Sequence, residues 1–270
     1  MRTATSRLPV ARLCHRASSG PYRFLPLSDT IRSSPCIQRG GTSGSGPGAC
    51  PACGAAVSDA DTCEGNTVEV LTDGLNFYPA ELEAMRGAER SINLEVYIFW
   101  AGEVVDQFIK VMSERASAGV RVNLLVDAVG SYGMAVWRSG LRRLRAAGCH
   151  VHFYHPLTPR MLDRINIRTH REIIVVDGRT AFVGGAGIAD HWMLPSRGRP
   201  WRDMMIQVTG RAATALQGIF VENWLEASGE ALVGERFFPE CEYPGSTHVL
   251  VINSSTRAVL RTHRFFISCC

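Results

Sequence analysis

The chain has 270 residues, of which 46% are hydrophobic and 20% charged, and these proportions fit a folded globular protein with a sizeable core. Its net charge of +4 comes from the N-terminal part, because residues 1–57 contain seven arginines and one acidic residue, whereas acidic residues slightly outnumber basic ones in the rest. This distribution gives no sign that the folded part binds nucleic acid. No run of eighteen apolar residues occurs, so we expect no membrane-spanning segment in this chain.

Residues 1–64 are rich in Ser, Gly, Pro and Arg. Such a segment cannot bury enough apolar surface to offset its ordering entropy, so we expect a disordered tail. Cys50 and Cys53 have the spacing of half a zinc knuckle, with Cys63 as a third ligand, but a fourth ligand is missing. We therefore predict no metal site. The nine cysteines show no disulfide framework, which favours a reducing compartment.

From residue 66 onward the sequence alternates between strand-like and helix-like hydrophobic periods. We expect strands over 67–71, 92–100, 120–126, 149–154, 204–208 and 247–252. Helices are expected over 80–90, where Pro79 would begin the helix, and over 104–118, 134–147 and 212–227. The strand over 247–252 could open a second lobe, and residues 258–270 fit no expected element.

The stretch 171–185 predicts a β-hairpin with a tight turn at Asp177-Gly178, and His170 lies at the mouth of its first strand. Strand–helix alternation elsewhere predicts parallel pairing with helices on both faces. The predicted fold class is therefore α/β, with a mixed, largely parallel β-sheet flanked by helices on both faces. We expect one lobe over residues 65–255 and an off-pattern tail over 256–270.

The hairpin also carries a motif. His170, Glu172 and Asp177 have the spacing of histidine-x-lysine-x4-aspartate, with glutamate at the lysine position, and Gly184-Gly185 follows. Other segments of the same pattern occur in order: Gly65-Asn66, Leu94–Phe99, Ala118–Val122, Asp127, Trp201-Arg202-Asp203 and Glu222-Asn223-Trp224. Together they resemble the phospholipase D superfamily (HKD motif), and within it the amino-terminal half of cardiolipin synthase-like proteins.

The resemblance implies a phosphatidyltransferase that works through a phosphohistidine, without a metal or other cofactor. Two motif copies face each other in this superfamily: one histidine attacks phosphorus, the other acts as general acid and then base, and two lysines hold the phosphate oxygens. The chain would thus need a second motif-bearing lobe or a homodimer. The implied substrate is an anionic, phosphatidylglycerol-like phospholipid, and the implied location is the surface of the bacterial cytoplasmic membrane.

The resemblance also assigns roles to single residues. His170 is the expected nucleophile or general acid; the alternative is a strand-end histidine without chemistry. Asp203 matches the family acid that orients the catalytic histidine, although a surface carboxylate is the alternative. Asp177 is interpreted as a turn residue rather than a proton carrier. Gly184 and Gly185 are expected to let the backbone approach the phosphate.

Glu172 is the main departure from the family pattern. A lysine ammonium attracts the phosphate, whereas a carboxylate at the same place opposes both binding and the charge of the transition state. Arg171 would point to the other strand face. Arg168 or Arg202 could reach the phosphate instead, so both are predicted phosphate-binding residues.

Three functions remain open. The first is an impaired, truncated phosphatidyltransferase half. The second is a phosphodiesterase or nuclease of the same superfamily that works as a homodimer, which the single motif favours and the tryptophan motifs disfavour. The third is a lobe that only binds lipid or a partner. Nucleic acid is the less favoured ligand.

Overall fold

The computed structural model describes residues 60–131, 137–156, 168–193, 200–240, 244–253 and 268–269. Most of the expected N-terminal tail, with Cys50 and Cys53, lies outside these ranges. The first elements along the chain are β1 (Ala60–Thr72), α3 (Gly74–Arg86), β2 (Ser91–Val96), α4 (Glu103–Ser117), β3 (Arg121–Asp127), α5 (Trp137–Ala146) and β4 (His150–Tyr154). They are followed by β5 (Glu172–Val176), β6 (Thr180–Gly184), the 3₁₀ helix η3 (Asp190–Trp192), β7 (Met204–Thr209), α6 (Arg211–Ser228), β8 (Thr247–Ile252) and β9 (Ser268–Cys269).

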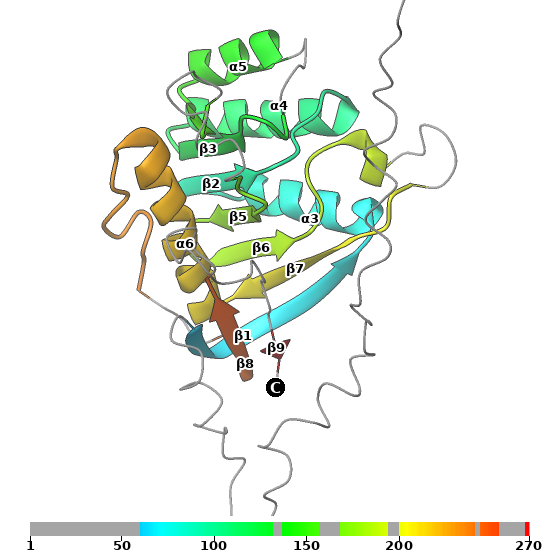
Figure 1. Ribbon diagram of the computed structural model, residues 1–270. Coiled ribbons are helices and arrows are strands. Elements are labelled where there is room, and N and C mark those ends of the chain that lie inside the picture. Colours follow the sequence, from blue (N-terminus) through cyan, green and yellow to red (C-terminus); the bar gives the residue numbers. More distant parts are fainter. Residues whose placement is uncertain are drawn as a thin grey trace, which may run out of the picture. The chain divides into compact units, whose positions relative to one another are not determined.

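The described strands form one sheet in the order β4-β3-β2-β5-β6-β7-β1-β8-β9 (Figure 1). The sheet is mixed, as predicted. Only the pairs β2–β3 and β3–β4 are parallel, however, and every other neighbouring pair is antiparallel. The sheet is therefore mostly antiparallel, and the expectation that it would be largely parallel is wrong. Parallel pairing is limited to the strands joined by α4 and α5. The hairpin strands, β1, β7, β8 and β9 all pair antiparallel.

The predicted hairpin is confirmed. Strands β5 and β6 pair antiparallel with Glu172 opposite Gly184, and their turn contains Asp177 with φ 54° and Gly178 with φ 66°. Two consecutive positive φ angles match the twist of the strands and favour Asp-Gly at these positions. The next pairing, β6 with β7, places Gly184 opposite Met205.

Helices cover both faces of the sheet, as predicted, and alternation along β5 shows how. Ile174 and Val176 belong to the core that packs against α3 and α4. Ile173 and Val175 belong to the core under α6. Glu172 shares its strand face with Ile174, so it faces the α3–α4 side.

Helix α3 begins earlier than expected. It starts at Gly74, so Pro79 lies inside the helix rather than at its first position. Proline provides no N–H for the carbonyl of Leu75. Leu75 is exposed, and the helix continues through the proline.

Strand β1 is longer than expected, and β8 has a different place. β1 begins at Ala60, inside the segment expected to be tail, and Ala60 pairs with Ile252 of β8. Asn66 fixes the irregularity between the two halves of β1, since its Nδ2 donates to the carbonyls of Cys63 at 2.7 Å and Thr247 at 3.0 Å. Strand β8, which was expected as the possible start of a second lobe, therefore belongs to this sheet and lies between β1 and β9.

Candidate functional site

His170, the glycine pair and Asp203 lie at one edge of the sheet. His170 lies two residues before β5, Gly185 directly follows β6, and Asp203 directly precedes β7. Because Glu172, Gly184 and Met205 are aligned across these three strands, extending the register by two positions brings His170 and Asp203 to the same edge. Asp177 lies at the opposite end of β5.

His170 is exposed, so its ring is not sealed inside the protein. The imidazole stacks on the ring of Tyr97, with 4.1 Å between ring centroids and an interplanar angle of 21°. Tyr97 directly follows β2, the strand that pairs with β5. Stacking contacts the face of the imidazole and leaves its two nitrogens at the ring edge available for hydrogen bonds or for attack on a phosphorus.

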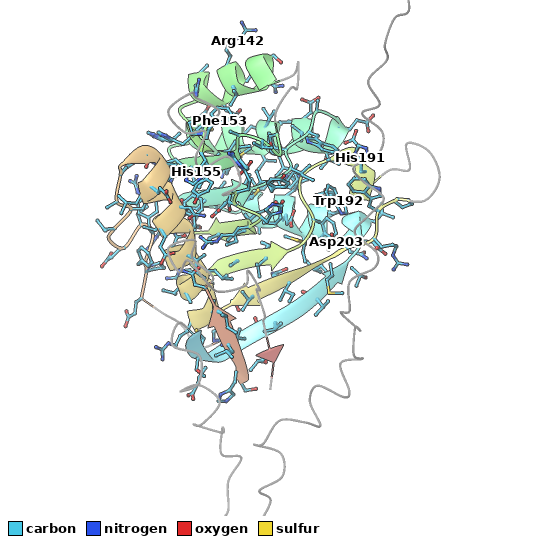
Figure 2. The ribbon with its side chains drawn as sticks, in the orientation of Figure 1. Arg142, Phe153, His155, His191, Trp192 and Asp203 are labelled. Atoms are coloured by element: carbon cyan, nitrogen blue, oxygen red, sulfur yellow. The ribbon has the colours of Figure 1, made fainter. Side chains whose placement is uncertain are left out.

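Asp203 is held by residues other than His170. Its Oδ2 accepts a hydrogen bond from Trp192 Nε1 at 3.3 Å, and its Oδ1 accepts one from the main-chain nitrogen of Met204 at 2.9 Å. Figure 2 shows Trp192 and Asp203 near each other on the side where β7 begins. Within the described residues no hydrogen bond joins Asp203 to His170, so the orienting role of Asp203 stays a prediction.

Glu172 points into the protein rather than toward an open site. The residue is 7% exposed, and its Oε1 accepts a hydrogen bond from the main-chain nitrogen of Tyr97 at 3.2 Å. Burial raises the pKa of this carboxyl group well above its usual value, which main-chain hydrogen bonds from Tyr97 and Ile98 only partly offset. Burial therefore shifts this carboxyl group toward its neutral form. The site lacks a cation at this position, and it does not gain the exposed anion that the sequence suggested.

A second buried acid lies behind His170. Glu95, on β2, accepts hydrogen bonds from the hydroxyl of Thr169 and from Asn223 Nδ2, the latter at 2.6 Å. Burial raises the pKa of Glu95, and the nearby Arg171 lowers it. Tyr97 and Glu95 were not among the site residues predicted from the sequence. A carboxylate between Leu94 and Val96, in an otherwise uncharged strand, is the signal that could have identified Glu95.

The arginines near the motif bind other protein groups. Arg168 Nη1 donates to the carbonyl of His155 at 2.9 Å and lies 3.7 Å from Asp127 Oδ1. Arg202 has an 80% exposed side chain, and its Nε donates to Asp73 Oδ1 at 2.7 Å. The structure thus gives each of the two predicted phosphate-binding arginines a carboxylate partner.

Arg171 extends to the α6 side, as strand alternation predicts. Its Nη1 donates to the carbonyl of Ile219 at 3.1 Å, and its Nη2 donates to Asn253 Oδ1 at 2.8 Å. Its guanidinium therefore joins β5 to α6 and to the end of β8, and it does not replace the motif lysine.

The paired glycines are required by strand packing. A Cβ on Gly184 would lie 2.3 Å from the carbonyl oxygen of Met204, and one on Gly185 would lie 2.8 Å from Asp203 Oδ1. Both glycines therefore allow β6 to approach the start of β7. This contact accounts for them without a bound phosphate.

Asp177 has the contacts of a turn residue. Its carboxylate accepts hydrogen bonds from the main-chain nitrogens of Glu89 at 2.9 Å, Arg90 at 2.7 Å and Ser91 at 2.8 Å. It thereby fixes the hairpin turn to the chain segment that enters β2. Strand β5 separates this turn from His170, so Asp177 does not contact the imidazole.

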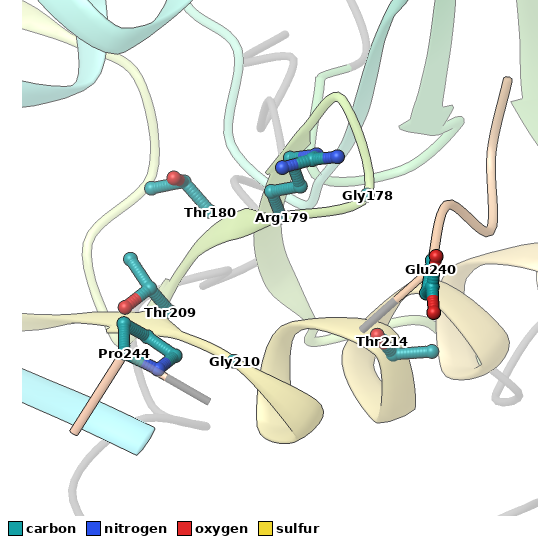
Figure 3. A pocket seen from close by; sticks show the side chains of 8 residues that line it. All are labelled: Gly178, Arg179, Thr180, Thr209, Gly210, Thr214, Glu240 and Pro244. Atoms are coloured by element: carbon teal, nitrogen blue, oxygen red, sulfur yellow. The ribbon is translucent and has the colours of Figure 1, made fainter. Parts of the chain in front are cut away.

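A pocket of about 230 Å³ lies beside the same turn (Figure 3). It is lined by Gly178, Arg179, Thr180, Thr209, Gly210, Thr214, Glu240 and Pro244. Its lining comes from the hairpin turn, the start of α6 and the segment between α6 and β8, so the pocket lies at the end of β5 opposite His170. In the described ranges, no group of three or more His, Cys, Asp or Glu side chains could hold a metal ion.

Residues 82–224, more than half of the chain, match the family described as "Cardiolipin synthase, PLD-like domain". The chain belongs to this family. It is 37% identical over 166 residues to a cardiolipin synthase of Geobacillus kaustophilus (strain HTA426), a match that covers 61% of this chain and 33% of that protein. It is 33% identical over 167 residues to the major cardiolipin synthase of Bacillus subtilis (strain 168), covering 61% of this chain and 34% of that protein.

The chain thus spans about a third of the length of the relatives it matches. Among solved structures, it is similar to Nuc of Salmonella typhimurium, a phospholipase D family member, with 16% identity, a TM-score of 0.46, and coverage of 63% of this chain and 99% of that one. No helix in the described part of this family member is long and apolar enough to cross a membrane.

Proposed function

We propose that the chain is one lobe of a phosphatidyltransferase that acts on an anionic, phosphatidylglycerol-like phospholipid. The observation that carries the proposal is the exposed imidazole of His170 at the sheet edge of a cardiolipin synthase-like domain. A buried His170 would have argued against such chemistry, but His170 is exposed.

In the proposed reaction a ring nitrogen of His170 forms a bond to phosphorus, and the bond between phosphorus and the glycerol oxygen breaks. The leaving glycerol takes a proton from a general acid, which a second motif-bearing lobe supplies. A hydroxyl group of another phosphatidylglycerol then attacks the phosphohistidine and loses its proton to the same group. His170 is released and the two phospholipids are joined.

The proposed activity is impaired because the site has no cation in the lysine position. Glu172 is buried there, and Arg168, Arg171 and Arg202 each bind another protein group. Loss of one contact that stabilises transition-state charge costs about a hundred- to a thousandfold in rate. We place the protein at the surface of a bacterial membrane, where such a phospholipid is found.

The same arginine contacts favour a second candidate, a lobe that binds lipid or a partner without turnover. Labelled phosphatidylglycerol separates the candidates. The assay uses a protein that joins this chain to a second motif-bearing lobe. Release of labelled glycerol that depends on His170 supports the transferase, whereas sedimentation with phosphatidylglycerol vesicles without any release supports the binding lobe. Nicking of plasmid DNA by a dimer of the chain would instead support a nuclease.

A further inference from the structure

Tyr97, directly after β2, is held by contacts from two other parts of the chain. Its main-chain nitrogen donates to Glu172, and its carbonyl accepts a hydrogen bond from Ser131 Oγ at 2.9 Å. A Cβ on Gly130 would lie 2.8 Å from two ring carbons of Tyr97, so the loop after β3 lies directly against the tyrosine ring. Contacts from β5 and from the β3 loop therefore determine where the ring lies.

His170 has the opposite character. It is exposed, it lies outside regular secondary structure, and within the described residues no hydrogen bond holds either ring nitrogen. A free histidine side chain of this kind would populate several rotamers. The stacked ring of Tyr97 is the contact that selects among them.

We propose that Tyr97 is the positioning residue of His170, and that Glu172 supports Tyr97 from inside the protein. Stacking on one face of the imidazole fixes the plane of the ring. Neither ring nitrogen is occupied by this contact, so both can take part in phosphoryl transfer. Glu172, at the position of the family lysine, thus has a structural role in place of an ion clamp. The chemical purpose of this arrangement rests on the proposed function, but the arrangement itself does not.

A second stacked pair in the molecule provides a comparison. His155 stacks on Tyr154 with 4.0 Å between centroids and an angle of 19°, but its Nε2 also lies 3.0 Å from Glu226 Oε1 and the residue is buried. Burial and the carboxylate hold His155 in addition to its stack. His170 has neither support, so removing its aromatic partner should free it.

The test is nuclear magnetic resonance of the histidine Hε1 protons in the full chain, with a His170→Gln variant to assign the signal. We expect the ring-current shift of the His170 signal to persist in Tyr97→Phe, which keeps the ring. In Tyr97→Leu the shift should vanish, and the three-bond couplings across the His170 Cα–Cβ bond should change from those of one rotamer to an average over several; couplings of a single rotamer there would overturn the proposal. The His155 signal should stay in place in both variants, which shows that the fold is intact.

An unchanged His170 signal in Tyr97→Leu, with His155 also unchanged, would overturn the proposal. Equal loss of the shift in Tyr97→Phe would overturn it too, because the hydroxyl group rather than the ring would then be responsible. None of these measurements requires turnover. Failure of the lipid assay therefore rejects the proposed function, and failure of the spectroscopic test rejects the positioning role.

Discussion

Glu172 accepts a hydrogen bond from the main-chain nitrogen of Tyr97 at 3.2 Å, and the ring of Tyr97 in turn stacks on the imidazole of His170. The residue that departs from the family motif is therefore connected to the motif histidine through one intermediate residue. This connection changes the meaning of the substitution. At the position of the family lysine this chain has a buried acid whose pKa burial raises, so that position presents neither a cation nor an exposed anion.

The first prediction concerns the pH dependence of stability. Burial raises the pKa of Glu172 well above its usual value near 4.5, so the native protein retains a proton that the unfolded chain releases above that pH. The free energy of unfolding should fall as the pH rises from about 4.5 to the raised native pKa, by roughly 1 to 1.5 kcal/mol per pH unit for each such proton. Glu81 and Glu95 also have raised pKa values and share in this decline.

Glu172→Gln keeps an oxygen that accepts the hydrogen bond from the main-chain nitrogen of Tyr97. It removes the carboxyl group whose proton the folded protein keeps and the unfolded chain releases. Urea unfolding between pH 5 and pH 8 should show a shallower decline in Glu172→Gln than in the wild type. Glu83→Gln is the matched control, because the Glu83 side chain is 81% exposed on α3. A decline as steep in Glu172→Gln as in the wild type would mean that Glu172 is charged in the folded protein.

The second prediction concerns Asp177. Asp177→Ala removes the acceptor of three main-chain hydrogen bonds and should lower the free energy of unfolding by about 2 kcal/mol. Asp177→Asn, which tolerates the positive φ of 54° and keeps one acceptor oxygen, should lose less. Thermal unfolding measures both. If Asp177→Ala is as stable as the wild type, the turn role is wrong.

The third prediction concerns the paired glycines. Gly184→Ala should lower the free energy of unfolding by about 1 to 3 kcal/mol, because its Cβ would lie 2.3 Å from the Met204 carbonyl oxygen. Gly218→Ala is the matched control: no atom lies within 4 Å of its added Cβ, and it should stabilise α6 by about 0.5 to 1 kcal/mol. Undiminished stability of Gly184→Ala would show that the contact with Met204 does not require glycine. The predicted approach of the backbone to a phosphate would then remain as the explanation for Gly184.

The hairpin illustrates what the sequence could predict. Asp177-Gly178 between two apolar runs is a local signal, and both residues adopt the positive φ angles that the signal implies. Helix and strand types followed from hydrophobic periods in the same way. The position of Pro79 was predicted wrongly because proline is frequent at helix starts, whereas α3 begins at Gly74 and continues through Pro79.

The site was less predictable than the fold. Strand alternation places Glu172 on one face of the sheet, but whether that face is buried depends on how α3 and α4 pack, which no local pattern reveals. The contacts of Arg168 and Arg202 with Asp127 and Asp73 join segments far apart in the sequence. The stack of His170 on Tyr97 likewise depends on the pairing of β2 with β5.

The fourth prediction concerns the missing cation. Glu172→Lys alone should restore little transfer, because the proposed general acid comes from a second motif-bearing lobe. In a protein that joins this chain to a second motif-bearing lobe, the same change should raise the rate of glycerol release about a hundredfold or more. Glu83→Lys, on the exposed surface of α3, is the control for added charge and should leave the rate unchanged. An equal increase from both variants would show a general effect of charge on lipid binding.

The central claim is that His170 attacks the phosphorus and needs a second lobe to do so. The most direct measurement is the release of labelled glycerol from phosphatidylglycerol vesicles by this chain alone, by the chain joined to a second motif-bearing lobe, and by the joined protein with His170→Ala. We predict no release by the chain alone, release by the joined protein, and its loss in the His170→Ala variant. Robust release by the unmodified chain, or release by the joined protein that survives His170→Ala, would contradict the claim.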